Sequence, residues 1–111
     1  MCGFVGVLGG VALNNETLLE MASMIAHRGP DDEGIWLDQQ AKVGLAHRRL
    51  AILDLSHEGH QPMISSSGRF IIVFNGEIYN HKSIRTELIA QRAHFKGYSD
   101  TEVLLTAVEQ W

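Results

Sequence analysis

The feature that most constrains the fold is an apolar segment that begins at the second residue of the chain. Cys2 to Leu8 (CGFVGVL) is short, apolar and partly β-branched, and Gly9-Gly10 ends it. Such a segment predicts a buried β-strand rather than a frayed tail, because its side chains are apolar. We therefore expect the fold to enclose its own amino terminus, together with Cys2, the single cysteine of the chain.

The position of Cys2 favours a chemical role. A lone cysteine is most often a small buried apolar residue. Initiator methionine, however, is commonly removed when the next side chain is small, and one residue would then carry a thiol and a free α-amino group. Thiolates are the reactive form of cysteine, and α-amino groups, which titrate near ~7.7–8.0, are partly neutral at pH 7. Nucleophile and base can thus come from one residue, as in enzymes activated by an amino-terminal threonine.

Length and composition indicate a single ordinary globular domain. The chain has 111 residues, 45% hydrophobic and 20% charged, with a net charge of −4. Lys and Arg are scattered, which argues against a nucleic-acid partner. One cysteine excludes an internal disulfide and fits a reducing compartment. No apolar run approaches the ~20 residues of a membrane span, and the start lacks the pattern of a signal peptide. We expect a cytoplasmic protein with no membrane partner.

Periodicity and turn residues predict a helix and then two strands in the first half. Asn15 is placed to cap a helix that runs to about Ala26. One face of that helix carries Leu18, Met21, Ala22 and Ile25. Segment 27–34 (HRGPDDEG) predicts a solvated turn, with a metal site in its acidic run as the weaker alternative. Strands are expected at 35–37 and 43–53, joined by a turn at 38–40.

Two arginines interrupt the second of these strands. Arg48 and Arg49 are bordered by Leu45, Leu50 and Ile52, so at least one should face an anion in a partly desolvated place. Segment 54–69 is rich in turn residues and predicts a loop. It contains two histidines three residues apart, but zinc sites need more ligands at regular spacing, and we expect no metal.

The second half contains one strand and two helices by the same criteria. Segment 70–74 (FIIVF) is continuously apolar and predicts a strand buried on both faces. It leads directly into Asn75-Gly76, a turn signal that would hold backbone N–H groups at a strand end. Asn80 is placed to cap a helix at 81–91, with Ile84, Leu88 and Ile89 inward. Ser99 and Glu102 form a capping-box pattern before a helix that contains Leu104, Leu105 and Val108.

These residues permit the hydrolysis of an amino acid amide. A tetrahedral oxyanion needs fixed donors, which Asn75 and Gly76 could supply. An α-carboxylate is best bound by a bidentate arginine, for which Arg49 is available, and an α-ammonium needs a carboxylate such as Asp100 or Glu77. Chemistry alone does not select this function, because most small domains contain such residues.

Six segments, in order along the chain, resemble a known family. They are MCGFVGVLGG, HRGPDDEGIW, GLAHRRLAILDLS, GHQPM, FNGEIYNH and YSDTEVLL. Together they resemble the class II glutamine amidotransferase domain of the N-terminal-nucleophile type, most of all the version at the start of asparagine synthetases. The resemblance covers nearly the whole chain. It implies an α+β fold, the αββα sandwich of N-terminal-nucleophile (Ntn) hydrolases.

The resemblance also assigns roles by position. Cys2 matches the family's nucleophile after removal of Met1, and Asn75 and Gly76 match its oxyanion hole. The binder of the glutamine carboxylate is matched by Arg49 with the backbone of Leu50, Ala51, Ile52 and Leu53. Glu77 and Asp100 match residues that hold the amino end of glutamine. The implied reaction is glutamine hydrolysis through a thioester on Cys2, which releases ammonia for an ATP-dependent synthetase that makes asparagine.

The match differs from the family in length. The family's domain continues through further strands, so residues 1–111 are expected to form its incomplete amino-terminal part. No cofactor is expected in this chain, since ATP and magnesium belong to the synthetase domain. Alternatives are a non-catalytic binding or interaction module, or ammonia supply to another class II acceptor such as glucosamine phosphate or phosphoribosylamine. Expected partners are glutamine, a synthetase domain or subunit, and a second copy that would cover open sheet edges by dimerising.

Overall fold

The chain has an α+β fold in a computed structural model, which describes residues 2–9, 13–52 and 56–111. The predicted class is confirmed. The elements are β1 (Gly3–Leu8), α1 (Asn15–Ser23), the 3₁₀ turn η1 (Ala26–Arg28), β2 (Asp32–Asp38), β3 (Val43–Arg49), the 3₁₀ turn η2 (His57–Gly59), β4 (Met63–Ile64), β5 (Ile71–Ile72), α2 (His81–Ala90) and α3 (Asp100–Gln110). Among these, no helix has the length and apolarity needed to cross a membrane.

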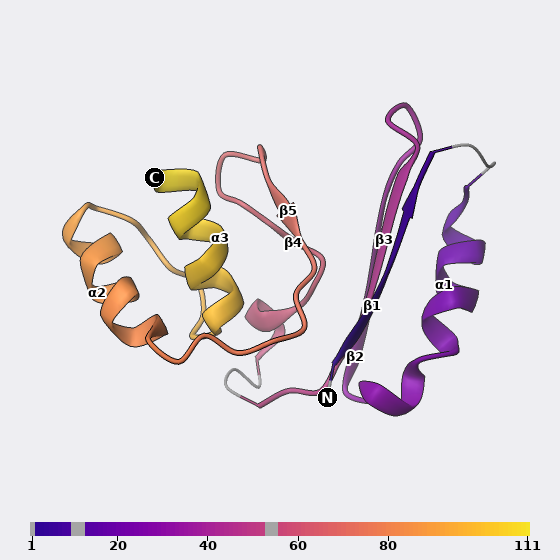
Figure 1. The fold of residues 1–111 in the computed structure, drawn as a ribbon, viewed down its shortest axis with the longest axis horizontal. Helices are drawn as coiled ribbons and strands as arrows, with labels where there is room; N and C mark the ends of the chain where they lie inside the picture. Colours follow the sequence, from indigo (N-terminus) through magenta and orange to yellow (C-terminus); the bar gives the residue numbers. More distant parts are fainter. Residues whose placement is uncertain (1, 10–12, 53–55) are drawn as a thin grey trace.

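The elements form layers in the order helix, sheet, sheet, helices (Figure 1). Helix α1 packs on the antiparallel sheet β1-β3-β2. The small antiparallel pair β4-β5 lies on the other side of that sheet, followed by α3 and α2 (Figure 1). This arrangement is consistent with the amino-terminal part of an αββα sandwich.

Strand register separates the two faces of the larger sheet. Ala46 on β3 pairs with Val5 on β1 and Ile35 on β2, and this face packs on α1 around buried Leu18 and Ala22. Full burial of a leucine stabilises a fold by about 1.5–3 kcal/mol. Because side chains alternate along a strand, the neighbouring residues of β3 point to the opposite face, toward β4-β5 and α3.

Helix α1 differs from its prediction in cap and extent. The cap is Asn14, whose side chain accepts from the N–H of Thr17 at 2.8 Å, and Asn15 is the first helical residue. The helix ends at Ser23, and the expected last turn is the 3₁₀ turn η1. Met21 is 37% exposed and does not join the core, because a helix on a flat sheet buries only a narrow stripe.

Strands β1 and β2 also correct the sequence interpretation. Phe4 is 50% and Leu8 84% exposed, so β1 is buried on one face only. The acidic run 31–33 is not wholly a solvated turn, because β2 already begins at Asp32. Glu33 in that strand pairs with Arg48 across the sheet, and this ion pair satisfies one of the two adjacent arginines.

The second half has less regular structure than predicted. Strand β5 covers only Ile71–Ile72, and both residues are half-buried rather than enclosed on both faces. Asn80 precedes α2 but makes no capping bond through its side chain. Of the apolar residues expected inward on α2, Leu88 is buried and Ile89 is 53% exposed.

Helix α3 begins with half of the predicted capping box. The hydroxyl of Ser99 accepts from the N–H of Glu102 at 3.2 Å. The Glu102 carboxylate, however, accepts from the backbone N–H groups of Lys96 and Gly97 rather than from that of Ser99. It therefore fixes the α2–α3 loop against the start of the helix, where Val103 and Leu105 are buried. Val108, in contrast, is 52% exposed.

Candidate active site

A cavity of about 410 Å³ lies between the end of the larger sheet and the start of α3, a size typical of small-molecule sites. Eight of the ten residues predicted for the site line it: Cys2, Arg49, Leu50, Ile52, Asn75, Gly76, Glu77 and Asp100. Segments far apart in sequence thus meet at one place. Their individual catalytic roles stay predictions.

Ala51, which was also predicted for the site, does not line the cavity. Ala51 donates its backbone N–H to the carboxylate of Asp31 at 2.9 Å, so this part of the proposed carboxylate binder is tied to the β2 side of the fold. Leu53 lies outside the described residues.

Cys2 is half-buried and fixed by backbone contacts. Its sulfur accepts from the N–H of Leu50 at 3.2 Å and lies 3.5 Å from the carbonyl oxygen of the same residue. The carbonyl of Cys2 accepts from Nε of Arg28 at 3.1 Å. Since Gly3 pairs with Arg48, alternation places Cys2 on the sheet face that carries Arg49. The ladder β1-β3 therefore brings the thiol and this guanidinium together.

Arg49 is a buried cation beside the cavity. Its side chain is 8% exposed, and Nη1 donates to the carbonyl of Ser56 at 2.7 Å. Among the described residues, no carboxylate forms an ion pair with it. Gly59 makes room for the guanidinium, because a Cβ at that position would lie 2.2 Å from Nη2. A buried guanidinium without a carboxylate can receive an anionic ligand.

The Asn75-Gly76 corner is exposed to the cavity, while the residue before it is held by two side chains. The N–H of Phe74 donates to Oε1 of Gln61 at 2.7 Å. The carbonyl of Phe74 accepts from Nε2 of His47 at 3.3 Å. Gln61 is in turn anchored by a 3.2 Å bond from its Nε2 to the Thr101 hydroxyl. Side chains thus take the place of a strand ladder here.

To make this contact His47 must carry a proton on Nε2, because a carbonyl oxygen only accepts. Burial is the main cause that lowers the pKa of His47 from 6.5 to about 4, against the opposing effect of the Phe74 bond. Electrostatic interactions with His60 and Arg49 lower the pKa further, and that with Asp32 raises it. At neutral pH the side chain is therefore uncharged.

Asp100 holds the far side of the same corner. This carboxylate is 7% exposed and accepts from the N–H of Ile78 through Oδ2 at 2.8 Å. Glu77 is an exposed residue at the rim. The cavity therefore places a buried cation and a buried anion on its walls, with a thiol and backbone donors beside them.

Sequence reasoning missed the residues that support the corner. Gln61, His47 and Thr101 carry no catalytic pattern, although all three lie in segments that the family resemblance includes. Gln61 acts as a clamp, in that it binds the N–H of Phe74 and the hydroxyl of Thr101. This role depends on which atoms lie near Gln61, and only the fold determines that.

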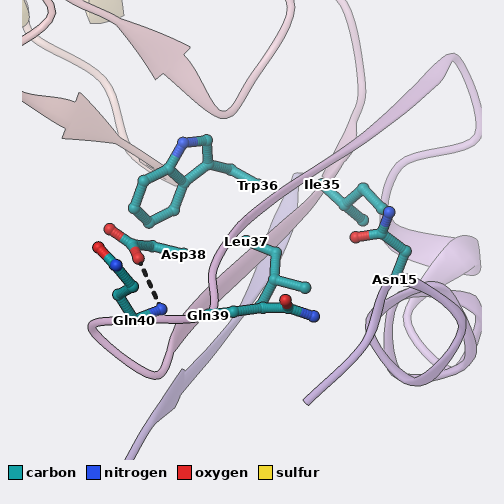
Figure 2. Close-up of a pocket in the computed structure, with 7 residues that line it drawn as sticks. All are labelled: Asn15, Ile35, Trp36, Leu37, Asp38, Gln39 and Gln40. Carbon is teal, nitrogen blue, oxygen red and sulfur yellow. Dashed lines mark hydrogen bonds between the residues drawn. The ribbon is translucent and has the colours of Figure 1, made fainter.

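A second hollow is larger but carries no comparable chemistry. It has a volume of about 660 Å³ and is lined by the β2–β3 hairpin and the start of α1, around Trp36 and Leu37 (Figure 2). Its carboxylate, Asp38, accepts from the backbone N–H groups of Gln40 and Ala41. That carboxylate shapes the turn, and the residues lining the hollow include no nucleophile.

Comparison with known proteins decides the family. The family model for a glutamine amidotransferase domain matches residues 1–111. The chain belongs to the glutamine amidotransferase family.

Relatives of this glutamine amidotransferase domain are much longer proteins. Glutamine-hydrolysing asparagine synthetase 1 of Bacillus subtilis (strain 168) is 43% identical over 100% of the chain and 18% of its own length. The enzyme named glutamine-hydrolysing asparagine synthetase 1 in Arabidopsis thaliana is 35% identical over 100% of the chain and 19% of its length. Amidase chry2 of Gibberella zeae is 38% identical over 86% of the chain and 14% of its length. The chain thus spans less than a fifth of each of these three.

Proposed function

We propose that this chain hydrolyses the side-chain amide of glutamine at Cys2 and releases ammonia for a synthetase partner. The observation that carries the proposal is the meeting of Cys2, Arg49, Asn75 and Asp100 around one cavity of about 410 Å³. Membership of the glutamine amidotransferase family supports the same substrate.

Glutamine is bound as a free zwitterion. Its α-carboxylate pairs with the buried guanidinium of Arg49, a contact that is strong because the pair is largely removed from water. Its α-ammonium is received by Asp100, with Glu77 at the rim. These contacts direct the side-chain amide toward Cys2 and the Asn75-Gly76 corner.

The reaction proceeds in two steps. After removal of Met1, the α-amine of Cys2 takes the thiol proton, and the thiolate attacks the amide carbon. Asn75 and the N–H of Gly76 stabilise the oxyanion. The C–N bond then breaks, and the α-ammonium of Cys2 gives its proton to the departing ammonia. Water attacks the resulting thioester with the amine as base, which yields glutamate and restores the thiol.

The ammonia is consumed by a synthetase activity outside these residues. Two of the three relatives described are named glutamine-hydrolysing asparagine synthetases, and in each the match covers a small part of a longer chain. We infer that ATP-dependent activation of aspartate takes place in such a partner, in the cytoplasm, and that asparagine is the product.

Ammonia release from glutamine tests the proposal. The purified chain, alone and mixed with a synthetase partner, should release ammonia and glutamate in equal amounts. Cys2→Ala should abolish release, because the sequence contains no other thiol. Intact mass should show that Met1 is absent from the active material. Glutamine binding without any release of ammonia, in both settings, would favour the binding-module alternative instead.

A further inference from the structure

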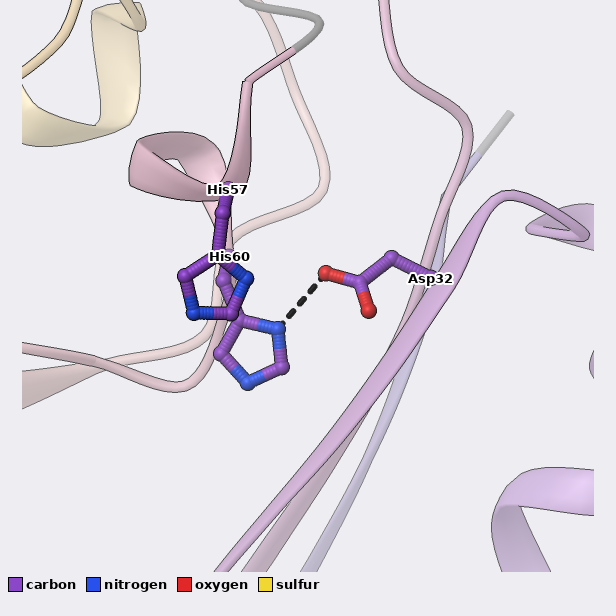
Figure 3. A group of neighbouring side chains, drawn as sticks. All are labelled: Asp32, His57 and His60. Carbon is purple, nitrogen blue, oxygen red and sulfur yellow. Dashed lines mark hydrogen bonds and ion pairs between the residues drawn. The ribbon is translucent and has the colours of Figure 1, made fainter.

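A cluster of three ligand-bearing side chains lies outside the cavity, where η2 meets the larger sheet. Asp32 is the first residue of β2, and His57 and His60 come from η2 and the residue after it. One ligand atom from each lies within 4.8 Å of the other two. Figure 3 shows both imidazoles and the carboxylate gathered at one place. None of the three lines the glutamine cavity.

Contacts within the cluster position its members. Nδ1 of His60 lies 2.6 Å from the carboxylate of Asp32. The His57 and His60 rings stack with centroids 5.1 Å apart and planes 23° from parallel. The sheet also leaves space for the His60 ring at Gly34, where a Cβ would lie 2.6 Å from Nε2. The fold thus assembles the cluster, because Asp32 lies 25 and 28 residues before the two histidines in sequence.

We propose that Asp32, His57 and His60 bind one divalent transition-metal ion of the Zn²⁺ class. Two imidazoles and one carboxylate are a donor set that Zn²⁺ and its neighbours prefer. Ligands of a tetrahedral zinc ion at ~2.0–2.1 Å stand about 3.4 Å apart. To reach that spacing, ligand atoms that now lie within 4.8 Å of one another must draw together, and the 2.6 Å contact between His60 and Asp32 must open to about 3.4 Å.

The fold supplies the third metal ligand that the sequence pattern lacked. The pair His57–His60 alone has too few ligands for zinc, which is why the sequence predicted no metal. The third ligand comes from β2, whose register brings Asp32 opposite Arg49 and so to the end of the sheet against which η2 packs.

A metal ion bound here would take no part in the chemical steps at Cys2. Its effect would be to fix the position of η2. Turn η2 and the residue before it also contact Arg49, through Gly59 and through the carbonyl of Ser56. A metal ion that joins His57 and His60 to β2 would therefore fix the turn on which the Arg49 guanidinium rests.

Direct binding of metal tests the proposal without any assay of activity. Calorimetric titration of the full chain with Zn²⁺ should give one equivalent bound, and Co²⁺ should produce visible absorption bands typical of mixed nitrogen and oxygen ligands. His57→Ala and His60→Ala should each weaken binding about tenfold or more, since even outer-shell partners of metal sites account for 10–100-fold. His57 is exposed, so its replacement should leave the fold intact, which circular dichroism would check.

Two controls decide between this cluster and other ligands. His94→Ala removes an exposed histidine outside the cluster and should leave the affinity for Zn²⁺ unchanged. Cys2→Ser should also leave it unchanged. Binding that survives His57→Ala and His60→Ala, binding that disappears with Cys2→Ser, or no binding of Zn²⁺ at all would each overturn the proposal.

Discussion

The two sides of the cavity are positioned by different kinds of interaction. On one side, Cys2 and Arg49 lie at the end of the ladder between β1 and β3, which runs over six paired residues on each strand. On the other side, the Asn75-Gly76 corner follows β5, which has only two residues in its ladder. The chain beyond β5 is held by the side chains of Gln61, His47 and Asp100.

This difference teaches which half of the site is robust to substitution. A ladder distributes its stabilisation over many backbone bonds, and a single side-chain replacement rarely removes one. A buried side-chain bond has no such reserve, since its loss leaves a backbone group unsatisfied at a cost of about 1–3 kcal/mol. We therefore expect the oxyanion corner to respond to remote substitutions that leave the thiol and the guanidinium in place.

Removal of the corner's own amide should give the largest change. Asn75→Ala is expected to lower kcat about 10²–10³-fold, the usual effect of losing one oxyanion donor, while KM changes less. Steady-state glutaminase assays measure both. Asn80→Ala is the matched control, because this nearby amide makes no capping bond and should leave kcat unchanged. An unaltered kcat in Asn75→Ala would remove this residue from the oxyanion hole.

The ladder side should respond in binding instead. Arg49→Ala is expected to weaken glutamine binding by about 2–4 kcal/mol, as for the loss of one partner of a desolvated charge pair, and to raise KM accordingly. Arg48→Ala, on the opposite face of the same strand, should leave KM unchanged and lower Tm through the loss of its pair with Glu33. If Arg49→Ala and Arg48→Ala have the same KM for glutamine, Arg49 does not bind the substrate.

Much of the first half could be predicted from the sequence. Apolar segments, helical periodicity and turn residues locate β1, the β2–β3 hairpin and α1, because local patterns determine these elements. The errors have local causes too. Asn14 and Asn15 are both acceptable caps, and the pattern cannot choose between them. The local pattern places Asp32 and Glu33 in a turn, whereas in the fold their side chains pair with His60 and Arg48.

The second half could be predicted less well, because polar side chains there replace backbone partners. The apolar run 70–74 indicates a long strand, yet Gln61 and His47 take the hydrogen bonds of Phe74. Chemistry named Cys2, Arg49, Asn75 and Asp100 as candidates, but only the family resemblance selected them. Chemistry alone permits many choices of arginine and carboxylate, and no periodicity places Gln61 or Thr101 beside the corner.

Acidification should lower the stability of the fold through the buried side chain of His47. Its pKa of about 4 in the fold is below the value near 6.5 of an unfolded chain. Above pH 6.5 both states are neutral and stability is unaffected. As the pH falls from 6.5 to 4, the unfolded chain binds a proton that the native chain excludes, so the free energy of unfolding decreases by about 3 kcal/mol in total.

Urea unfolding at pH 7 and at pH 4.5 measures this contribution. His47→Gln keeps an N–H donor for the Phe74 carbonyl but does not titrate, so its stability should fall less than that of the unaltered chain between these pH values. His94→Gln, at an exposed histidine, should retain the full decrease. If His47→Gln and the unaltered chain lose the same free energy, burial of His47 is not the source of the pH dependence.

Replacement of Gln61 should give the smallest effect but the sharpest test of the comparison. This buried amide accepts from the N–H of Phe74 and donates to Thr101, and it contacts neither Cys2 nor Arg49 through any bond described. Gln61→Leu removes both bonds and should lower the free energy of unfolding by about 1–3 kcal/mol.

If the Asn75-Gly76 corner depends on the bonds of Gln61, kcat should fall in Gln61→Leu while KM for glutamine stays near its original value, because the ladder still holds Arg49. Gln61→Glu retains an acceptor for the Phe74 N–H and should recover part of kcat. An equal rise of KM and fall of kcat in Gln61→Leu would instead mean that both sides of the cavity move together, and the distinction between ladder-held and side-chain-held residues would fail.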